Sequence, residues 1–136
     1  MKLVDTSVVV AAFASWHELH GPAMAVLSAL PVLPAQCALE AYSVLTRLPP
    51  PHRASPAVVR DFLDANFGDR YVTLVAGRFP QLVSELAELG IAGGATYDAL
   101  IAAIARDAGG TLVTCDQRAR PTYERIGITV EYLAAP

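Results

Sequence analysis

Four acidic residues have the type and the placement to act together in chemistry. Asp5 directly follows the apolar residues Leu3 and Val4, and Asp116 ends the apolar segment "GTLVTCD". Glu40 and Asp98 lie in two apolar, helix-like segments, "CALEAYSVLTR" and "TYDALIAAIARDAGG". Carboxylate oxygens are hard ligands that favour Mg²⁺ or Mn²⁺, with water completing the coordination. The four residues therefore predict a metal-binding carboxylate cluster.

The surroundings of these acids strengthen this interpretation. Glu40 is the only charged residue before Arg47 in a helix that is apolar on nearly every face, which is typical of a buried helix. Asp98 shares its helical face with Ile101 and other apolar residues. An unpaired carboxylate in such a place costs several kcal/mol. Basic partners are scarce, since only Arg47 and Arg106 lie on these two helices, and a divalent cation is the usual remedy for clustered acids.

Short apolar segments alternate with helical ones along the chain, and this order predicts how the acids are positioned. The strands are expected at residues 2–4, 32–33, 71–75, 112–115 and 128–132. The helices are expected at residues 7–14, 22–30, 38–47, 55–67, 79–90 and 96–110, with Ser55 and Thr96 as N-caps and Gly90 and Gly109 as stops. The strands are continuous Leu and Val runs, which suits burial on both faces. The sequence therefore predicts an α/β fold with a largely parallel sheet.

This topology brings the four acids to one edge of the sheet. Asp5 and Asp116 come just past the carboxyl ends of strands, where ligands bind in open α/β sheets. Helices that cross back over a parallel sheet begin at that same edge. Asp98 and Glu40 are both expected in the first turn of such a helix, so all four side chains are predicted to converge.

Each acid also has an ordinary structural explanation. Asp5 could cap the helix that follows it, and Asp98 could match a helix dipole at the surface. Glu40 could be a solvated acid, and Asp116 could be a turn residue. The ordinary explanations require four independent coincidences on one edge of the sheet, whereas a single metal site explains all four placements.

Composition limits the function further. The chain has 136 residues, of which 54% are hydrophobic and 17% charged, and its net charge of −3 provides no basic field for nucleic acid. Contact with nucleic acid would need a local arginine patch or bound cations. Cys37 and Cys115 suggest buried thiols in a reducing compartment. Neither a signal peptide nor a run of roughly 20 apolar residues is present, so we expect a cytoplasmic protein.

Two other groups of residues invite a functional interpretation. "WHELHG" places His17 and His20 three residues apart, one residue short of the zinc motif H-E-x-x-H, and predicts ordinary helix-surface histidines. Arg118, Arg120 and Arg125 follow Asp116 closely. These arginines either contact phosphate, with Arg118 and Arg120 as candidate RNA contacts, or form a solvated charged segment.

Four segments together resemble one known family. "VDTSVV", "LEAYSVLTR", "YDALIAAIA" and "LVTCDQRA" occur in the order typical of PIN-domain ribonucleases, specifically the VapC-type toxins of type II toxin–antitoxin systems. The resemblance implies a single PIN domain over residues 1–136, with a three-layer α/β/α sandwich and a mainly parallel central sheet. It also implies an endoribonuclease that needs Mg²⁺ or Mn²⁺, a cognate antitoxin partner and a homodimer.

The same resemblance assigns roles to residues. Asp5, Glu40, Asp98 and Asp116 become the catalytic, metal-holding acids, and Thr6, Ser7 and Thr114 become supporting polar residues. One departure concerns the third position after the last aspartate, where relatives often have an aromatic residue. This chain has Ala119 there, with Tyr123 one turn later.

Two rival functions are weighed against this one. A phosphatase of the haloacid type also has an acid at a strand end, but its chemistry needs a second acid two residues on, where this chain has Ser7. A non-catalytic PIN-like scaffold that binds RNA or protein predicts a degraded acidic set, whereas all four acids are present.

Overall fold

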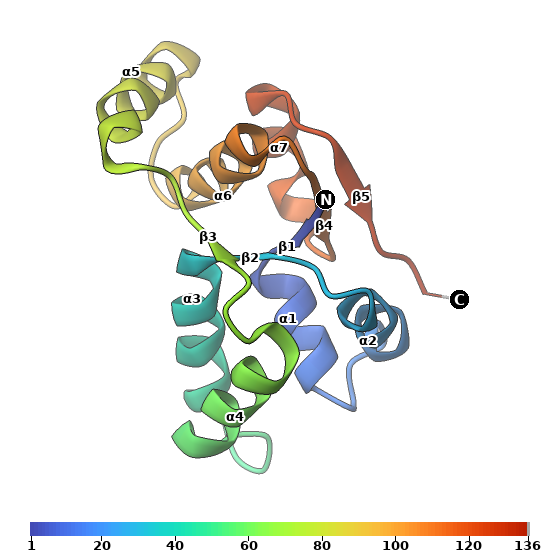
Figure 1. The fold of residues 1–136 in the computed structure, drawn as a ribbon. Coiled ribbons are helices and arrows are strands. Elements are labelled where there is room, and N and C mark those ends of the chain that lie inside the picture. Colours follow the sequence, from blue (N-terminus) through green and yellow to red (C-terminus); the bar gives the residue numbers. More distant parts are fainter. Residues whose placement is uncertain (136) are drawn as a thin grey trace.

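A computed structural model describes residues 1–135, in which short strands alternate with helices (Figure 1). The strands are β1 (Lys2–Val4), β2 (Leu33–Pro34), β3 (Tyr71–Val72), β4 (Thr111–Thr114) and β5 (Val130–Tyr132). The α-helices are α1 (Thr6–Phe13), α2 (His20–Ser28), α3 (Ala35–Thr46), α4 (Pro56–Phe67), α5 (Phe79–Leu89), α6 (Ala95–Ala108) and α7 (Arg120–Ile126). Two 3₁₀ helices, η1 (Ala76–Arg78) and η2 (Gln117–Ala119), precede α5 and α7.

Every strand pairing is parallel. β4 lies between β1 and β5, while β2 pairs with β3. A bridge between Leu3 and Val32 joins the two groups, with the Val32 N–H donating to the Lys2 carbonyl at 2.9 Å. The resulting order is β3-β2-β1-β4-β5, and its direction reverses between β1 and β4. In doubly wound folds, this switch point at the carboxyl ends of the strands is where ligands bind.

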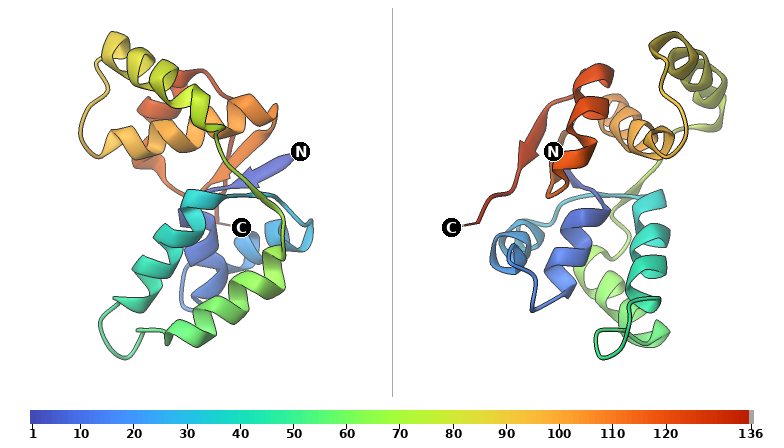
Figure 2. Two further views of the ribbon diagram at one scale, coloured as in Figure 1. Left: turned by 60° about the vertical axis from the view of Figure 1, so that its left-hand side comes forward. Right: turned by 180° about the vertical axis from the view of Figure 1, so that it is seen from behind.

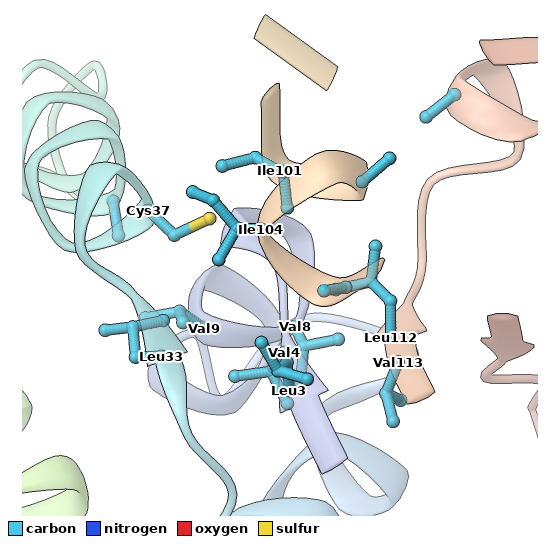
Figure 3. Close-up of a cluster of buried hydrophobic side chains, with 14 of the residues drawn as sticks. Leu3, Val4, Val8, Val9, Leu33, Cys37, Ile101, Ile104, Leu112 and Val113 are labelled. Atoms are coloured by element: carbon cyan, nitrogen blue, oxygen red, sulfur yellow. The ribbon is translucent and has the colours of Figure 1, made fainter. Parts of the chain in front are cut away.

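Helices cover the sheet on both sides, as predicted. Helices α1 to α4 lie on one side of the strands and α5 to α7 on the other, and the further views agree (Figures 1 and 2). Side chains from β1, β4, α1, α3 and α6 meet in the core between the layers (Figure 3). Leu3, Val4, Leu112 and Val113 are fully buried, which explains why these strands are continuous apolar runs without alternation.

Local sequence signals account for most helix ends. The Ser55 hydroxyl accepts the Val58 N–H and Pro56 occupies the first turn of α4, as predicted. Gly109 ends α6 with φ +69°, in the left-handed region that favours glycine. At the next residue, Gly110, a Cβ would overlap the buried Leu3 side chain and lie 3.0 Å from the Met1 backbone oxygen, so any other residue requires a shift there.

Three predicted helix starts were wrong. Helix α2 begins at His20 and not at residue 22, so Pro22 lies within its first turn. Helix α6 begins at Ala95 with Gly94 as N-cap, so Thr96 lies inside the first turn. The turn at Gly93, with φ +64°, sets this earlier start. Helix α3 begins at Ala35, directly after β2, because Pro34 takes the N-cap position and leaves no linker. This earlier start shifts Glu40 from the first turn of α3 to the second.

Strand β3 is also shorter than the predicted 71–75. It is an edge strand whose only partner, β2, has two residues before α3 begins, so no ladder exists to extend it. Among residues 1–135, no helix is both long and apolar enough to cross a membrane.

Candidate active site

Asp5 is fixed at the junction of β1 and α1. Its backbone N–H donates to the Val113 carbonyl of β4 at 3.2 Å. Its carboxylate caps α1 by accepting the backbone N–H groups of Ser7 at 3.1 Å and Val8 at 3.4 Å. Asp5 therefore caps α1, which is the ordinary structural explanation that the sequence offered beside a metal ligand. The cap uses only the Oδ1 atom, and Asp5 is buried with 5% of its surface exposed.

Three hydroxyl groups complete the hydrogen bonding of this carboxylate. Ser7 Oγ donates to Oδ1 at 2.5 Å, and Thr114 Oγ1 donates to Oδ2 at 2.5 Å. Tyr123, on α7, donates its hydroxyl to Oδ2 at 2.9 Å. Ser7 Oγ also accepts the Cys115 N–H at 2.8 Å, so the network ties α1 to the end of β4. Asp5 thus occupies one orientation.

Sequence reasoning missed the contact between Tyr123 and Asp5. Tyr123 is 1% exposed, and a buried tyrosine hydroxyl needs a partner. The tyrosine lies on α7, while its partner Asp5 lies directly after β1, 118 residues earlier. Ala119, where relatives often have an aromatic residue, is also buried. The usable signal was a tyrosine at the apolar face of a short helix, directly beside a predicted site.

All four predicted acids line one small cavity of about 40 Å³. Asp98 lies in the first turn of α6, and Asp116 lies two residues past the end of β4. Glu40 reaches the cavity from the second turn of α3, and its side chain is exposed, so the prediction of a buried Glu40 was wrong. The buried face of α3 consists of Cys37, Ala41 and Leu45 instead. The rest of the cavity lining is Thr6, Ser7, Cys37, Ile101 and Tyr123.

The carboxylates repel one another. Burial, followed by the negative charges of Asp116, Asp5 and Glu40, raises the pKa of Asp98 from 3.8 to about 6. Burial also raises the pKa of Asp5, although its hydrogen bonds oppose this rise. Burial and the negative charge of Asp5 raise the pKa of the Tyr123 hydroxyl. They also raise the pKa of the Cys115 thiol, to about 11. The cavity therefore disfavours negative charge as long as no cation neutralises it.

Arg118 is the one positive group that lowers the pKa of Asp98. Its Nε lies 3.3 Å from Asp116 Oδ1, and its side chain is 92% exposed. Asp116 also accepts the Arg118 backbone N–H at 2.9 Å, so it caps η2 as its turn interpretation predicted. Arg120 is engaged elsewhere, with Gln117 and Glu124 and over the ring of Tyr132 at 3.9 Å. The structure thus brings Arg118, and not Arg120, beside the acids.

The donor set fits a hard divalent cation in its chemistry. It offers carboxylate and hydroxyl oxygens with a surplus of negative charge, and neither Asp98 nor Glu40 makes a side-chain hydrogen bond within the part of the chain that the structure describes. Among residues 1–135, however, no three His, Cys, Asp or Glu side chains are placed closely enough to enclose an ion together.

The histidines differ from the prediction of helix-surface positions. His17 lies in the turn between α1 and α2, where its Nδ1 accepts the Leu19 N–H at 3.0 Å. His20 begins α2, and its Nδ1 contacts the Ala11 carbonyl at 2.9 Å. Both side chains are partly buried because they close the connection between the two helices.

The sequence profile of the PIN domain matches residues 2–125. The chain belongs to the PIN-domain family. It is 49% identical over 127 residues to Ribonuclease VapC40 of Mycobacterium tuberculosis, covering 93% of this chain and 95% of that protein. It is 38% identical over 128 residues to Ribonuclease VapC27 of the same species, covering 93% of each chain. The predicted membership of a VapC-type PIN domain is therefore confirmed.

Solved structures confirm the predicted fold. The PIN domain superposes with TM-score 0.67 and 21% identity on a chain of the crystal structure of FitAcB from Neisseria gonorrhoeae, covering 96% of both chains. A chain of FitAB bound to an IR36 DNA fragment gives TM-score 0.67 at 18% identity, covering 97% of this chain and 94% of that one. PAE2754 from Pyrobaculum aerophilum gives TM-score 0.61 at 20% identity, covering 95% and 89%.

Proposed function

We propose that this PIN domain is an endoribonuclease that depends on Mg²⁺ or Mn²⁺ and hydrolyses RNA phosphodiester bonds. One observation carries the proposal. Four carboxylates with a single nearby cation line one cavity at the switch point of the sheet, in a chain 49% identical to a protein named Ribonuclease VapC40. Asp5, Glu40, Asp98 and Asp116 hold the metal. Thr6, Ser7 and Thr114 support them.

The residues around the cavity account for the reaction without a histidine base. A bound divalent ion supplies an activated water and neutralises charge on the phosphate. Ser7, Thr114 and Tyr123 hold the Asp5 carboxylate in one orientation, which is the role of groups that surround metal ligands. The carboxylate oxygens of Asp98 and Glu40 accept no hydrogen bond within residues 1–135 and are available to a metal ion. Arg118 beside Asp116 meets the negatively charged RNA backbone at the rim.

The biological setting belongs to the same proposal. The protein acts in the cytoplasm as a single PIN domain, the toxin of a VapBC-type pair, and a cognate antitoxin holds it inactive. Homodimer formation is proposed as well. Large apolar side chains on the outer faces of α3 and α5, such as Leu39 and Val83, are more than 60% exposed and provide a surface for a partner chain.

The test is cleavage of cellular RNA by the antitoxin-free protein in Mg²⁺, Mn²⁺ or EDTA. Cleavage is expected with either ion and not in EDTA, and Asp98→Asn should reduce it at least a hundredfold. Asp107→Asn is the matched control, because it makes the same change on the same helix at a side chain paired with Arg78, away from the cavity. Metal binding without cleavage, and without growth arrest on expression, would favour the scaffold alternative.

A further inference from the structure

A second, larger pocket adjoins the acid cavity. It has a volume of about 400 Å³ and shares Thr6, Ser7, Glu40 and Asp116 with the cavity. From there it extends over Val10 to the turn between α1 and α2. This volume falls in the range of about 300–1,000 Å³ in which small molecules bind. Because the two share lining residues, a nucleotide attached to a phosphate at the acids can reach this pocket.

His17 lies in the wall of this pocket, in a turn that hydrogen bonds hold firmly. The His17 N–H donates to the Ala14 carbonyl at 2.9 Å, and the His20 N–H donates to the His17 carbonyl at 3.0 Å. The ring itself is held because Nδ1 accepts the Leu19 N–H at 3.0 Å. A neutral imidazole that accepts at Nδ1 carries its proton on Nε2. His17 is therefore a fixed neutral N–H donor, and its Nε2 makes no hydrogen bond within residues 1–135.

The chemistry of the pocket changes along its length. At the shared end, Asp116 and the exposed Arg118 lie together, which suits a metal-bound phosphate. At the far end, Val10 and Leu19 provide an apolar wall, with His17 as a donor and Glu18 as an acceptor. Glu18 repels a phosphate there. A nucleobase has an apolar face and an edge that carries both donors and acceptors, so it fits this end.

We propose that this pocket holds the unpaired base of the nucleotide next to the cleaved bond, and that His17 is a specificity-determining residue. Its Nε2–H donates to an acceptor atom on the edge of that base. This inference rests on the proposed ribonuclease function and deepens it, because it makes cleavage depend on the base beside the bond. RNA in which that base is paired is excluded, since its edge is already occupied.

Two substitutions of His17 separate substrate contact from structural support. In His17→Asn, the side-chain oxygen replaces Nδ1 as acceptor for the Leu19 N–H, and the outer donor is lost. In His17→Gln, the outer N–H is retained and the acceptor near Leu19 is lost. If His17 contacts the base, His17→Asn increases KM about three- to tenfold with unchanged kcat and melting temperature, the effect of one lost hydrogen bond. His17→Gln then keeps KM close to wild type and melts at a lower temperature.

The measurement uses a short single-stranded RNA that spans a cleavage site mapped with the wild-type protein. A second RNA carries an abasic residue beside the cleaved bond. The abasic RNA should increase KM for the wild type and have no further effect in His17→Asn, because both changes remove the same contact. Equal KM values for His17→Asn and wild type would overturn the inference, and so would fully additive effects of the abasic residue and the mutation.

Failure of the proposed function is visible separately. If the wild-type protein cleaves no RNA, the ribonuclease proposal fails. The Kd in the presence of Mn²⁺ is then measured for the wild type and His17→Asn, each with a short single-stranded homopolymer RNA and with the same RNA carrying abasic residues. A three- to tenfold weaker Kd for His17→Asn, matched by the abasic RNA, supports the base pocket in a binding protein. No difference in Kd overturns it.

Discussion

Replacing Asp98 by asparagine should stabilise the metal-free protein at neutral pH. Asp98 is partly buried, its carboxylate accepts no hydrogen bond within residues 1–135, and three other carboxylates lie near it: Asp116, Asp5 and Glu40. Arg118 is the one cation that opposes their effect. Asparagine has nearly the same shape and no charge, so the substitution removes the cost of burying a charge and the repulsion from the other acids, and leaves the packing of α6 intact.

The size of the effect follows from the pKa of Asp98. A rise from 3.8 to about 6 disfavours the ionised form by about 3 kcal/mol, at 1.36 kcal/mol per unit. Water reaches part of this side chain, and screening reduces the contribution to stability to roughly 1–2 kcal/mol. For a chain of this length, the variant should melt about 3–8 °C above the wild type in EDTA at pH 7.5.

The dependence on pH has a definite sign. Because the pKa of Asp98 is higher in the folded protein than in the unfolded chain, the folded state binds more protons between pH 4 and 6. The wild-type protein therefore loses stability as the pH rises through this window, relative to Asp98→Asn. The difference should be close to zero at pH 4 and complete above pH 6.5. Urea denaturation at pH 4, 5, 6 and 7.5, in EDTA, measures it.

Asp107→Asn on the same helix provides a control of opposite sign. The hydrogen bond from Arg78 lowers the pKa of Asp107, with Nε at 2.8 Å from Oδ2. Its contribution to stability is present above the pKa of the unfolded chain and is lost as the pH falls, so this variant should be less stable than wild type at pH 7.5. If Asp98→Asn were also no more stable than wild type in EDTA, or if its advantage were the same at pH 4 and pH 7.5, the cost of an ionised Asp98, from burial and from the neighbouring acids, would be the wrong explanation.

Adding Mn²⁺ should reverse the order of the two proteins. Ligand binding stabilises the folded state by RT ln(1 + [L]/Kd), so a wild-type protein at one hundred times its Kd gains about 2.7 kcal/mol. Asp98→Asn, with one ligand fewer, should gain less at the same concentration. A melting experiment with increasing Mn²⁺ tests the metal site without any RNA, and an equal gain in both proteins would exclude Asp98 as a ligand.

Three further predictions follow from contacts around the site and between helices α5 and α6. Thr114→Val removes the hydroxyl that donates to Asp5 and accepts the Asp116 N–H, and should reduce stability by about 1–3 kcal/mol in urea denaturation, whereas Thr114→Ser should keep most of it. Tyr123→Phe removes one donor to Asp5 and should weaken Mn²⁺ binding measured by calorimetry about tenfold, because the carboxylate loses a group that orients it. Arg106→Gln breaks the bidentate pair that joins α5 to α6 through Glu85, at 2.8 and 2.9 Å, and should increase amide exchange in α5 with little change in α1.

Sequence reasoning located the acids because charge is conspicuous in an apolar segment. Glu40 and Asp98 stand out in segments that are mostly uncharged and rich in Ala and Leu, and the scarcity of bases nearby is visible without a structure. The parallel topology then placed Asp5 and Asp116 at one edge, since both follow buried strands. One prediction that failed was the first residue of helix α3. Helix α3 begins directly after Pro34 at the end of β2, which places Glu40 in the second turn, and Glu40 is exposed because the buried face of α3 is formed by Cys37, Ala41 and Leu45.

The hydroxyl network was beyond prediction for a different physical reason. Serine, threonine and tyrosine are neutral and compatible with a core, so the family resemblance placed Ser7 and Thr114 near the site, but their hydrogen bonds, and that of Tyr123 to a residue 118 positions away, were not predicted. Yet these neutral groups make Asp5 different from Asp98. The Asp5 carboxylate accepts five hydrogen bonds, which oppose the rise in its pKa that burial causes, whereas the Asp98 carboxylate accepts none within residues 1–135. In this site, hydrogen bonds hold the Asp5 carboxylate in position, whereas the charge of Asp98 would be neutralised only when a metal ion binds. Substitutions around Asp5 should therefore alter mainly stability and orientation, and substitutions of Asp98 should alter mainly charge.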